Sequence, residues 1–439
     1  MSVVQLGSYR QRLKKTTLFK YTGKVTRVTG LIIEVKGLKA SIGDLCSIEI
    51  TGSGQLLSEV VGFRDESSIL MSLGEIRGIS PGCRVVPIGR SFEVDVGEEL
   101  LGKVIGSLGE VLEGEMPPLS GGRYTIQNTP PNPLKRKPIT DILETGIRSI
   151  DALLTCGTGQ RIGIFSGSGV GKSTLLGMIA RNSSADVNVI ALIGERGREV
   201  LEFIKKDLGP EGLKRSVVLV STSDQPALLR VKGALVATSI AEFFRDQGKN
   251  VLFMMDSVTR FAMAQREIGL AVGEPPTTKG YPPSVFALLP KLLERAGNMY
   301  TGSITGLYTV LVDADDMNEP IADAVRGILD GHIVLSRQLT VQNHFPAIDV
   351  LESVSRLMPD IANREHFRMA SRLKNYLAIY RKNQDLINIG AYQKGTNADI
   401  DETIKIYPFI EDFLKQDIEE TSTFNETIAA LAEVLGEEE

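Results

Sequence analysis

The sequence of 439 residues contains no tryptophan, and aromatic residues make up only 6% of it. A surface that binds nucleic acid by stacking bases on aromatic rings would therefore have few side chains to build on. The net charge of −5 also differs from the strongly basic character of nucleic-acid-binding domains. We expect no nucleic-acid partner.

Cysteines are scarce as well, since only three are present and none belongs to a Cys-x-x-Cys pair. An odd number of dispersed cysteines is not typical of a disulfide framework. Apolar runs stay well short of the ~20 residues that a membrane-spanning helix needs. The first 20 residues also lack the apolar centre of a secretory signal peptide. These absences predict a cytoplasmic protein.

Short runs rich in β-forming residues, among them GKVTRVTGLIIEV and SSILMSL, follow one another between glycines over residues 21–90. Several short strands separated by turn residues predict a small β-barrel domain. Residues 1–20 precede it as an N-terminal arm. A proline-rich stretch, NTPPNPLKRKP at residues 128–138, is typical of an extended connector.

Residues 91–358 have a different pattern, in which continuous apolar runs alternate with segments of helical periodicity. The runs are RIGIFS, VNVIALIGE, SVVLVSTS, NVLFMMDS, LYTVLVDAD and HIVLS. Buried strands that alternate with helices predict an α/β domain with a mostly parallel sheet. Over residues 359–439 the strands stop and the periodicity is helical, which predicts a C-terminal helical domain.

The stretch FSGSGVGKST lies where an apolar strand meets the start of a helix. It fits the phosphate-binding pattern G-x-x-x-x-G-K-[ST], except that Ser166 replaces the first glycine. Glycines let the backbone N–H groups face a polyphosphate, Lys172 reaches the β- and γ-phosphates, and the Ser173 hydroxyl binds Mg²⁺. We expect Ser166 at the edge of the strand, away from these N–H groups. The predicted site for ATP and Mg²⁺ comprises Gly167, Ser168, Gly169, Val170, Gly171, Lys172, Ser173 and Thr174.

Two other interpretations of this loop are weaker. A dinucleotide-binding fold requires G-x-G-x-x-G, and this register is absent, because lysine stands where the last glycine would be. A glycine-rich turn without a ligand remains the simplest alternative.

Hydrolysis needs more than a phosphate loop, and two carboxylates follow apolar strands. Asp256 ends NVLFMMD in the manner of a Walker B aspartate, which belongs to the magnesium shell. Glu195 ends VNVIALIGE, where it can polarise a water molecule, and Glu199 follows four residues later. A carboxylate after a strand is common by itself, so a nucleotide carrier without activity stays open, although Glu195 argues against it.

The segment PAIDVLESVSR at residues 346–356 fits the pattern P-[SAP]-[LIV]-[DNH]-x-x-x-S-x-S of the α and β subunits of rotary ATP synthases. Three further segments resemble the ATPases of type III protein export, the flagellar and injectisome enzymes: DSVTRFAMAQREIGLAVGEPP, GYPPSVFALLPKLLERAGN and DADDMNEPIADAVRGILDGHIVLSR. The resemblance covers about Gly23 to Gln416. It implies a RecA-like P-loop NTPase core between the barrel and the helical domain, and it makes Ser166 a trait of the family.

The resemblance also implies roles for single residues. Glu195 corresponds to the catalytic glutamate, Asp256 to the Walker B aspartate, and Arg260 to an arginine near the γ-phosphate. Arg356 corresponds to an arginine finger that acts on the neighbouring subunit's site. Phe345 falls where an aromatic ring stacks on adenine. An ion pair within the subunit remains an alternative for Arg356, and core packing remains one for Phe345.

As a whole, the resemblance implies a homohexameric ring that hydrolyses ATP to energise type III protein export, with the flagellar system preferred. The implied partners are a regulator that binds the N-terminal segment, a central stalk protein, export-gate membrane proteins and chaperone–substrate complexes. The basic stretch SYRQRLKK suits peripheral contact with the inner face of the cell membrane. A solvated terminus is the alternative for this stretch.

Three other functions remain as alternatives. An injectisome ATPase shares these motifs. The catalytic subunit of an ATP synthase would lack the three export-like segments and would need a non-identical partner subunit. An RNA-dependent helicase or translocase of related fold is disfavoured by the acidic balance and by the few aromatic residues over 21–90.

Overall fold

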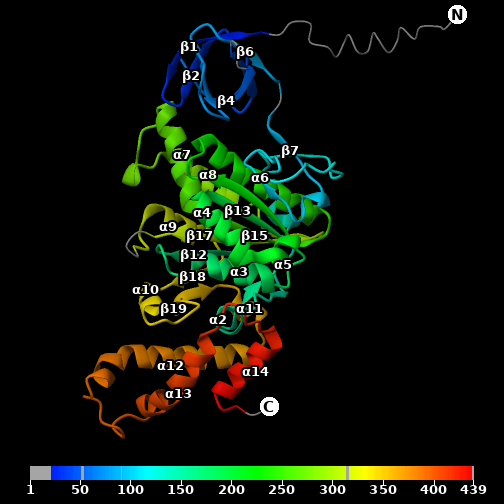
Figure 1. The fold of residues 1–439 in the computed structure, drawn as a ribbon. Helices are drawn as coiled ribbons and strands as arrows, with labels where there is room; N and C mark the ends of the chain where they lie inside the picture. Colours follow the sequence, from blue (N-terminus) through cyan, green and yellow to red (C-terminus); the bar gives the residue numbers. More distant parts are fainter. Residues whose placement is uncertain (1–20, 51–53, 90, 313–315, 438–439) are drawn as a thin grey trace, which may run out of the picture. The chain divides into compact units, whose positions relative to one another are not determined.

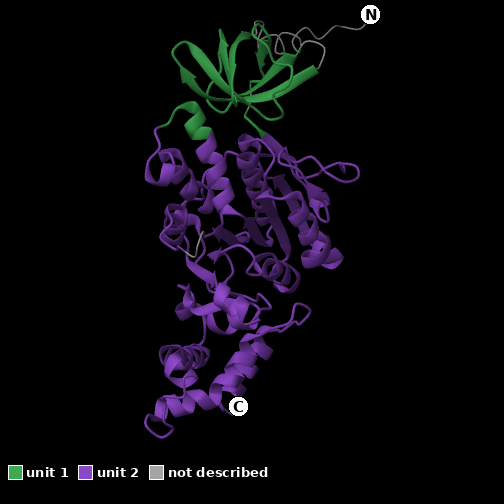
Figure 2. Cartoon of the chain, turned by 60° about the vertical axis from the view of Figure 1, so that its left-hand side comes forward, with its two compact units in different colours: residues 1–92, 268–274 green, residues 93–267, 275–439 purple. Residues whose placement is uncertain are grey.

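The computed structural model describes residues 21–50, 54–89, 91–312 and 316–437, which form two compact units (Figure 2). Unit 1 contains residues up to 92 together with 268–274, and unit 2 contains 93–267 and 275–439. The predicted N-terminal arm at residues 1–20 lies outside the described residues.

Unit 1 is a closed β-barrel with the strand order β1-β2-β5-β4-β3-β6 (Figure 1). Alternate side chains of its strands point inward, so that Ile33, Val35, Ile48, Val60 and Leu70 form a buried core. The barrel predicted from the sequence is confirmed. Its strands are β1 Gly23–Thr29, β2 Ile32–Lys36, β3 Leu45–Ile50, β4 Gly54–Arg64, β5 Ser67–Ser72 and β6 Arg84–Pro87.

Unit 2 is built on a sheet with the strand order β19-β18-β12-β17-β15-β13-β14-β8, in which β16 also pairs with β17. Neighbouring strands run parallel, except at β19 and β16. The mostly parallel sheet of the prediction is confirmed. The strands are β8 Val104–Ile105, β12 Arg161–Ser166, β13 Val187–Glu195, β14 Ser216–Thr222, β15 Asn250–Asp256, β16 Gly297–Asn298, β17 Ser303–Leu311, β18 Gly331–Leu335 and β19 Ile348–Ser355.

Helices follow most of these strands, and α6 packs on β13, β14 and β15. A π-helical turn, Phe203–Leu208, joins α4 to α5. Unit 2 also contains two small two-stranded sheets. One pairs β7 (Glu93–Asp95) with β9 (Arg123–Thr125), and the other pairs β10 (Ile142–Leu143) with β11 (Cys156–Gly157). The helices of this part of unit 2 are α2 Arg148–Leu153, α3 Lys172–Asn182, α4 Gly197–Glu202, α5 Gly209–Lys214, α6 Ala227–Asp246, α7 Val258–Val272 (up to residue 267), α8 Pro283–Leu293, α9 Pro320–Ile328 and α10 Arg337–Val341.

The C-terminal helices share the core of unit 2, because α12, α13 and α14 all pack against α2 (Figure 1). Ile150 of α2, Leu176 of α3 and Leu373 of α12 belong to one buried cluster with the sheet residues Ile164 and Leu192. The helices are α11 Met358–Ile361, α12 Arg364–Asn388, α13 Ala398–Leu414 and α14 Phe424–Val434. Helix α14 begins with a capping box between Thr423 and Glu426.

One predicted strand differs in its bounds, and one strand was not predicted. Strand β17 spans Ser303–Leu311, whereas the apolar run predicted a strand from Leu307 to Asp315, of which residues 313–315 lie outside the described residues. The sequence also gave no prediction of β19, which covers Ile348–Ser355 at the edge of the sheet. Its buried and exposed positions do not alternate regularly, so the apolar pattern of a buried strand is missing.

Within the described residues, the helices include none with the length and apolar character that crossing a membrane requires.

A buried ion pair holds α6 against the end of α8. Arg295 and Glu242 are each 1% exposed and are joined by two hydrogen bonds of 2.8 and 2.7 Å. Arg295 also donates to the carbonyl of Ile126 and to Ser239, while Asn128 donates to Glu242. All five polar groups are thus tied into one network.

We predict that Glu242→Ala lowers the free energy of unfolding by about 3–5 kcal/mol, because it leaves the guanidinium of Arg295 buried without its carboxylate. Urea denaturation followed by circular dichroism measures the change. The control is Glu211→Ala, since Glu211 pairs with Lys214 at exposed fractions of 79% and 71%. Loss of that pair costs about 0–1 kcal/mol. Equal effects of the two variants would contradict the prediction.

Candidate functional site

The predicted phosphate loop connects β12 to α3. Strand β12 ends at Ser166, α3 begins at Lys172, and Ser168 and Gly169 are exposed between them. Gly169 and Gly171 have φ values of 78° and 86°, which other residues rarely adopt. The first turn of α3 therefore directs its free N–H groups toward the loop, as polyphosphate binding requires.

Ser166 occupies the last position of β12, as the sequence predicted. It is buried, and its Oγ has no hydrogen-bond partner in the part of the chain that the structure describes. The side chain that replaces the first glycine of the motif therefore does not block the N–H groups of the loop.

Three charged side chains converge where β12, β13 and β15 end. Lys172 forms an ion pair with Asp256, and its Nζ lies 3.6 Å from Oε1 of Glu195. The side chains of Lys172 and Glu195 are each 12% exposed, and that of Asp256 is 5% exposed. The two carboxylates follow neighbouring parallel strands, so the fold itself brings them to one edge of the sheet.

A β-bulge aims the side chain of Glu195. The pairing of β13 with β14 shifts register between Ile193 and Glu195, and Gly194 between them has a φ of 73°. Glu195 therefore leaves the strand alternation and turns toward Lys172.

Glu195, at the end of β13, and Glu199, four residues later, have pKa values that are shifted in opposite directions. Burial and the negative charge of Asp256 raise the pKa of Glu195 to about 7, against the opposing effect of Lys172. A hydrogen bond with Glu195 lowers the pKa of Glu199. Burial alone would lower the pKa of Lys172, but the attraction of Asp256 and Glu195 prevails and raises it. The site thus pairs a charged lysine with a carboxyl group that titrates near neutrality.

The donor set suits Mg²⁺ bound together with a polyphosphate. Ser173 in the first turn of α3 and Asp256 at the end of β15 supply oxygen donors. No group of three or more His, Cys, Asp or Glu among the described residues could hold a metal ion by itself. Mg²⁺ sites of this kind use one or two carboxylates and complete the shell with phosphate oxygens and water.

Arg260 packs against Gly194, the residue before Glu195, because a Cβ atom on Gly194 would come within 2.8 Å of the Cβ of Arg260. The backbone N–H of Arg260 donates to the hydroxyl of Ser257. Its Nε is buried and has no hydrogen-bond partner within the described ranges. The side chain of Arg260 therefore lies against the residue that precedes Glu195, at the end of β13.

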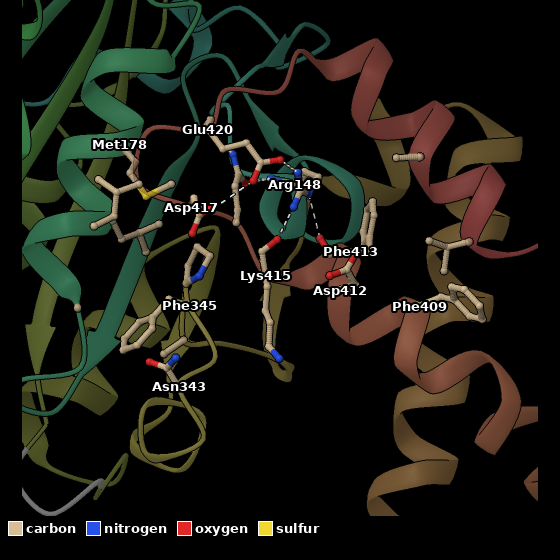
Figure 3. Close-up of a pocket in the computed structure, with 18 of the residues that line it drawn as sticks. Arg148, Met178, Asn343, Phe345, Phe409, Asp412, Phe413, Lys415, Asp417 and Glu420 are labelled. Atoms are coloured by element: carbon tan, nitrogen blue, oxygen red, sulfur yellow. Dashed lines mark hydrogen bonds and ion pairs between the residues drawn. The ribbon is translucent and has the colours of Figure 1, made fainter.

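A pocket of about 1430 Å³ opens beside the loop (Figure 3). Val170, Gly171 and Thr174 line it together with Phe345, whose ring carbons would lie 3.7 Å from a Cβ on Gly171. Phe345 is 40% exposed, so the alternative of core packing does not describe it. An exposed aromatic ring next to a phosphate loop is suited to stack on a nucleotide base.

The far wall of this pocket contains residues that the sequence did not reveal. Figure 3 shows Arg148 reaching Glu420 and the carbonyl groups of Phe413 and Lys415. Gln416 accepts from the N–H of Arg148, and its own N–H donates to the carbonyl of Phe345. These residues lie up to 272 positions apart and follow no known motif, so no local signal could have identified them.

Arg356 does not join the cluster. Its N–H donates to the carbonyl of Asp330, whose carboxylate binds Arg161 at the start of β12. The loop lies at the other end of this strand, about 17 Å away at 3.3 Å per residue. Arg356 is exposed and contacts the carbonyl of Arg326 at 3.3 Å, and it forms no ion pair with any described residue. The alternative of an ion pair within the subunit is therefore not supported.

Three family models match the chain in succession. Residues 25–89 match the β-barrel domain of the ATP synthase alpha/beta family, and residues 146–355 match its nucleotide-binding domain. Residues 362–433 match the C-terminal domain of the type III secretion ATPase EscN.

Whole proteins are similar over nearly the full length. A flagellum-specific ATP synthase of Bacillus subtilis is 58% identical over 97% of this chain and 98% of the relative. A type 3 secretion system ATPase of Xanthomonas euvesicatoria is 50% identical over 94% and 93%. The structure of the assembled ATPase EscN from enteropathogenic E. coli superposes with a TM-score of 0.89 at 48% identity, covering 94% of this chain and all of that one. EscN in complex with its central stalk EscO gives a TM-score of 0.87 at 47% identity, with the same coverage.

We predict that kcat/KM for ATP hydrolysis rises with pH through about 7, because kcat/KM reports the free enzyme, in which the pKa of Glu195 is raised to about 7 and only the ionised form can polarise water. Steady-state assays at MgATP concentrations well below KM, from about pH 5.5 to pH 9, test this. Glu195→Gln is the control, since it should bind ATP, hydrolyse it poorly and lose this limb of the profile. A limb that persists in Glu195→Gln would assign the titration to another group.

Proposed function

We propose that this chain, which belongs to the ATP synthase α/β family and within it to the ATPases of type III protein export, hydrolyses ATP at the sheet edge where β12, β13 and β15 end. The observation that carries this proposal is the convergence of Lys172, Glu195 and Asp256 beside the phosphate loop. A carrier without activity would not need a carboxyl group tuned to titrate near neutrality at that position.

In this mechanism, the ion pairs of Lys172 with Asp256 and Glu195 are exchanged for contacts with the β- and γ-phosphates. Glu195, released from Lys172, orients and polarises the attacking water. Arg260 contributes positive charge near the γ-phosphate. Bound Mg²⁺, held by Ser173 and Asp256, would neutralise charge on the phosphate oxygens. Phe345 stacks on the adenine ring and fixes the other end of the nucleotide.

The last catalytic group comes from a second copy of the chain. Arg356 lies at the opposite edge of the sheet from its own loop, so it acts as an arginine finger on the site of a neighbouring subunit. A head-to-tail contact of this kind closes into a ring when the rotation between copies permits. The similarity to assembled EscN, at 48% identity, supports a homohexamer.

The physiological process that we propose is the energising of flagellar type III protein export. The flagellum-specific relative is 58% identical, compared with 50% for the secretion-system relative from Xanthomonas, and this difference favours the flagellar role over the injectisome. The EscN–EscO complex supports a central stalk protein as a partner. The proposal also includes partners that the comparisons do not show: a regulator that binds the N-terminal segment, export-gate proteins and chaperone–substrate complexes. It further includes peripheral contact with the inner face of the membrane.

We predict that cells carrying Lys172→Ala keep normal levels of the protein but lose motility and secretion of the flagellar filament protein. The control is Lys214→Ala, which changes a lysine with a 71% exposed side chain on α5. Immunoblots of culture supernatants and swimming assays measure both effects. Normal flagellar secretion combined with loss of another secreted class would replace the flagellar role with the injectisome role.

We predict that Arg356→Ala reduces kcat by about 10³–10⁵-fold and leaves ATP affinity nearly unchanged, since the finger stabilises charge that develops in the transition state. Lys172→Ala is inactive for a different reason, because it lacks the lysine that binds phosphate. Assembly of the two variants in equal amounts restores activity to about one quarter, since a quarter of the interfaces combine an intact loop with an intact finger. ATPase assays of the mixture test this.

Mixtures that stay inactive would show that Arg356 does not act between subunits. The specific activity of the unchanged protein gives an independent control, because it should rise with protein concentration as rings assemble. A dilute monomer with full activity would contradict the shared site.

A further inference from the structure

A buried hydroxyl group contacts the Walker B carboxylate from the neighbouring strand. Thr309 lies on β17, which is hydrogen-bonded to β12 on one side and to β15 on the other. It is 0% exposed, and its Oγ1 lies 2.7 Å from Oδ1 of Asp256 and 3.3 Å from the carbonyl oxygen of Met255. The motifs of the sequence do not include this residue.

The single hydrogen of the hydroxyl goes to the carboxylate. The bond to Asp256 is 0.6 Å shorter than the contact with Met255, and an ionised acceptor makes the stronger hydrogen bond. The carbonyl of Met255 does not depend on Thr309, because β15 and β17 pair through their backbones at this position.

Asp256 has a second contact, but that contact is temporary. Lys172 and Thr309 both donate to Oδ1 of Asp256. The other oxygen, Oδ2, receives neither of these two hydrogen bonds. Binding of a polyphosphate exchanges the contact of Lys172 with Asp256 for contacts with phosphate oxygens. From then on, Thr309 is the neighbour that still fixes the orientation of the carboxylate.

We propose that Thr309 is a positioning residue for Mg²⁺, which keeps the carboxylate of Asp256 in the orientation that holds the ion after Lys172 has moved to the nucleotide. This inference rests on the proposed function, because it assigns Asp256 to the Mg²⁺ shell. It follows the general pattern in which a carboxylate that binds a metal is itself held by a hydrogen bond, so that its direction is set before the ion arrives.

The experiment compares three variants in the full chain. Thr309→Val keeps the shape and removes the hydroxyl, whereas Thr309→Ser keeps the hydroxyl. Thr305→Val is the matched control, because Thr305 is also buried on β17 but accepts from the N–H of Gly159 and not from the site. Binding of a fluorescent ADP analogue is titrated with Mg²⁺ and, separately, in EDTA. ATPase activity is then measured against Mg²⁺ concentration.

We expect Thr309→Val to need about 10–100-fold more Mg²⁺ for half-maximal binding and activity, the usual effect of removing a group that orients a metal ligand. Its affinity for the ADP analogue in EDTA should stay unchanged. Thr309→Ser should restore most of the Mg²⁺ affinity. Thr305→Val should keep the Mg²⁺ dependence of the unchanged protein, whatever it does to thermal stability.

An unchanged Mg²⁺ dependence in Thr309→Val would overturn the proposal, and so would a serine variant that behaves like valine. If Thr309→Val does not fold, Thr309→Ala is compared with Thr309→Ser in the same titrations and judged by the same outcomes. Failure of the proposed function has a different signature. In that case the unchanged protein would itself show no Mg²⁺-dependent hydrolysis of ATP, and both proposals would be withdrawn.

Discussion

The arrangement of the site depends on one buried cation between two carboxylates. Lys172 cannot be removed from water without a partner, and Asp256 and Glu195 supply the opposite charge from neighbouring strands. A polyphosphate can replace these partners because it also offers negative oxygens, and the exchange releases both carboxylates for their tasks. The parallel order of β12, β17, β15 and β13 is what makes this possible, since it collects the C-terminal ends of the strands at a single edge.

The direction of strand β19 separates the residues at its two ends. It runs antiparallel to β18, with Ile348 opposite Leu335 at the loop edge and Ser355 opposite Gly331 at the other edge. Phe345 therefore precedes the strand beside its own nucleotide pocket, while Arg356 follows it on the far side of the sheet. A parallel strand in the same place would need a crossover connection between these edges. The reversal places the two ends of a segment of twelve residues, 345–356, at opposite edges of the sheet, as the proposed roles of Phe345 in its own site and of Arg356 in a neighbour's site require.

The parts of the site that the sequence predicted are those whose chemistry lies within a few residues. The loop around Lys172, the carboxylates after β13 and β15, and the parallel sheet all leave local patterns. Thr309 and Gln416 leave none, because each acts through a partner that is remote in the sequence and close only in the fold. The sequence did not predict strand β19, because this edge strand lacks the continuous apolar character of the central strands. The resemblance to a family singled out Arg356. Only the structure shows that Arg356 lies far from the phosphate loop of its own chain.

The pocket beside the phosphate loop is lined by residues of both the helical domain and the α/β layer. Phe345 belongs to the segment before β19, and the opposite wall is the segment after α13, held by Arg148 and Gln416. A nucleotide that contacts this wall with its base and α3 with its phosphates bridges the two layers. A bound nucleotide can favour one position of the helical domain relative to the sheet only if its contacts differ between the states before and after hydrolysis. In the proposed mechanism, the γ-phosphate would supply such a difference at Lys172.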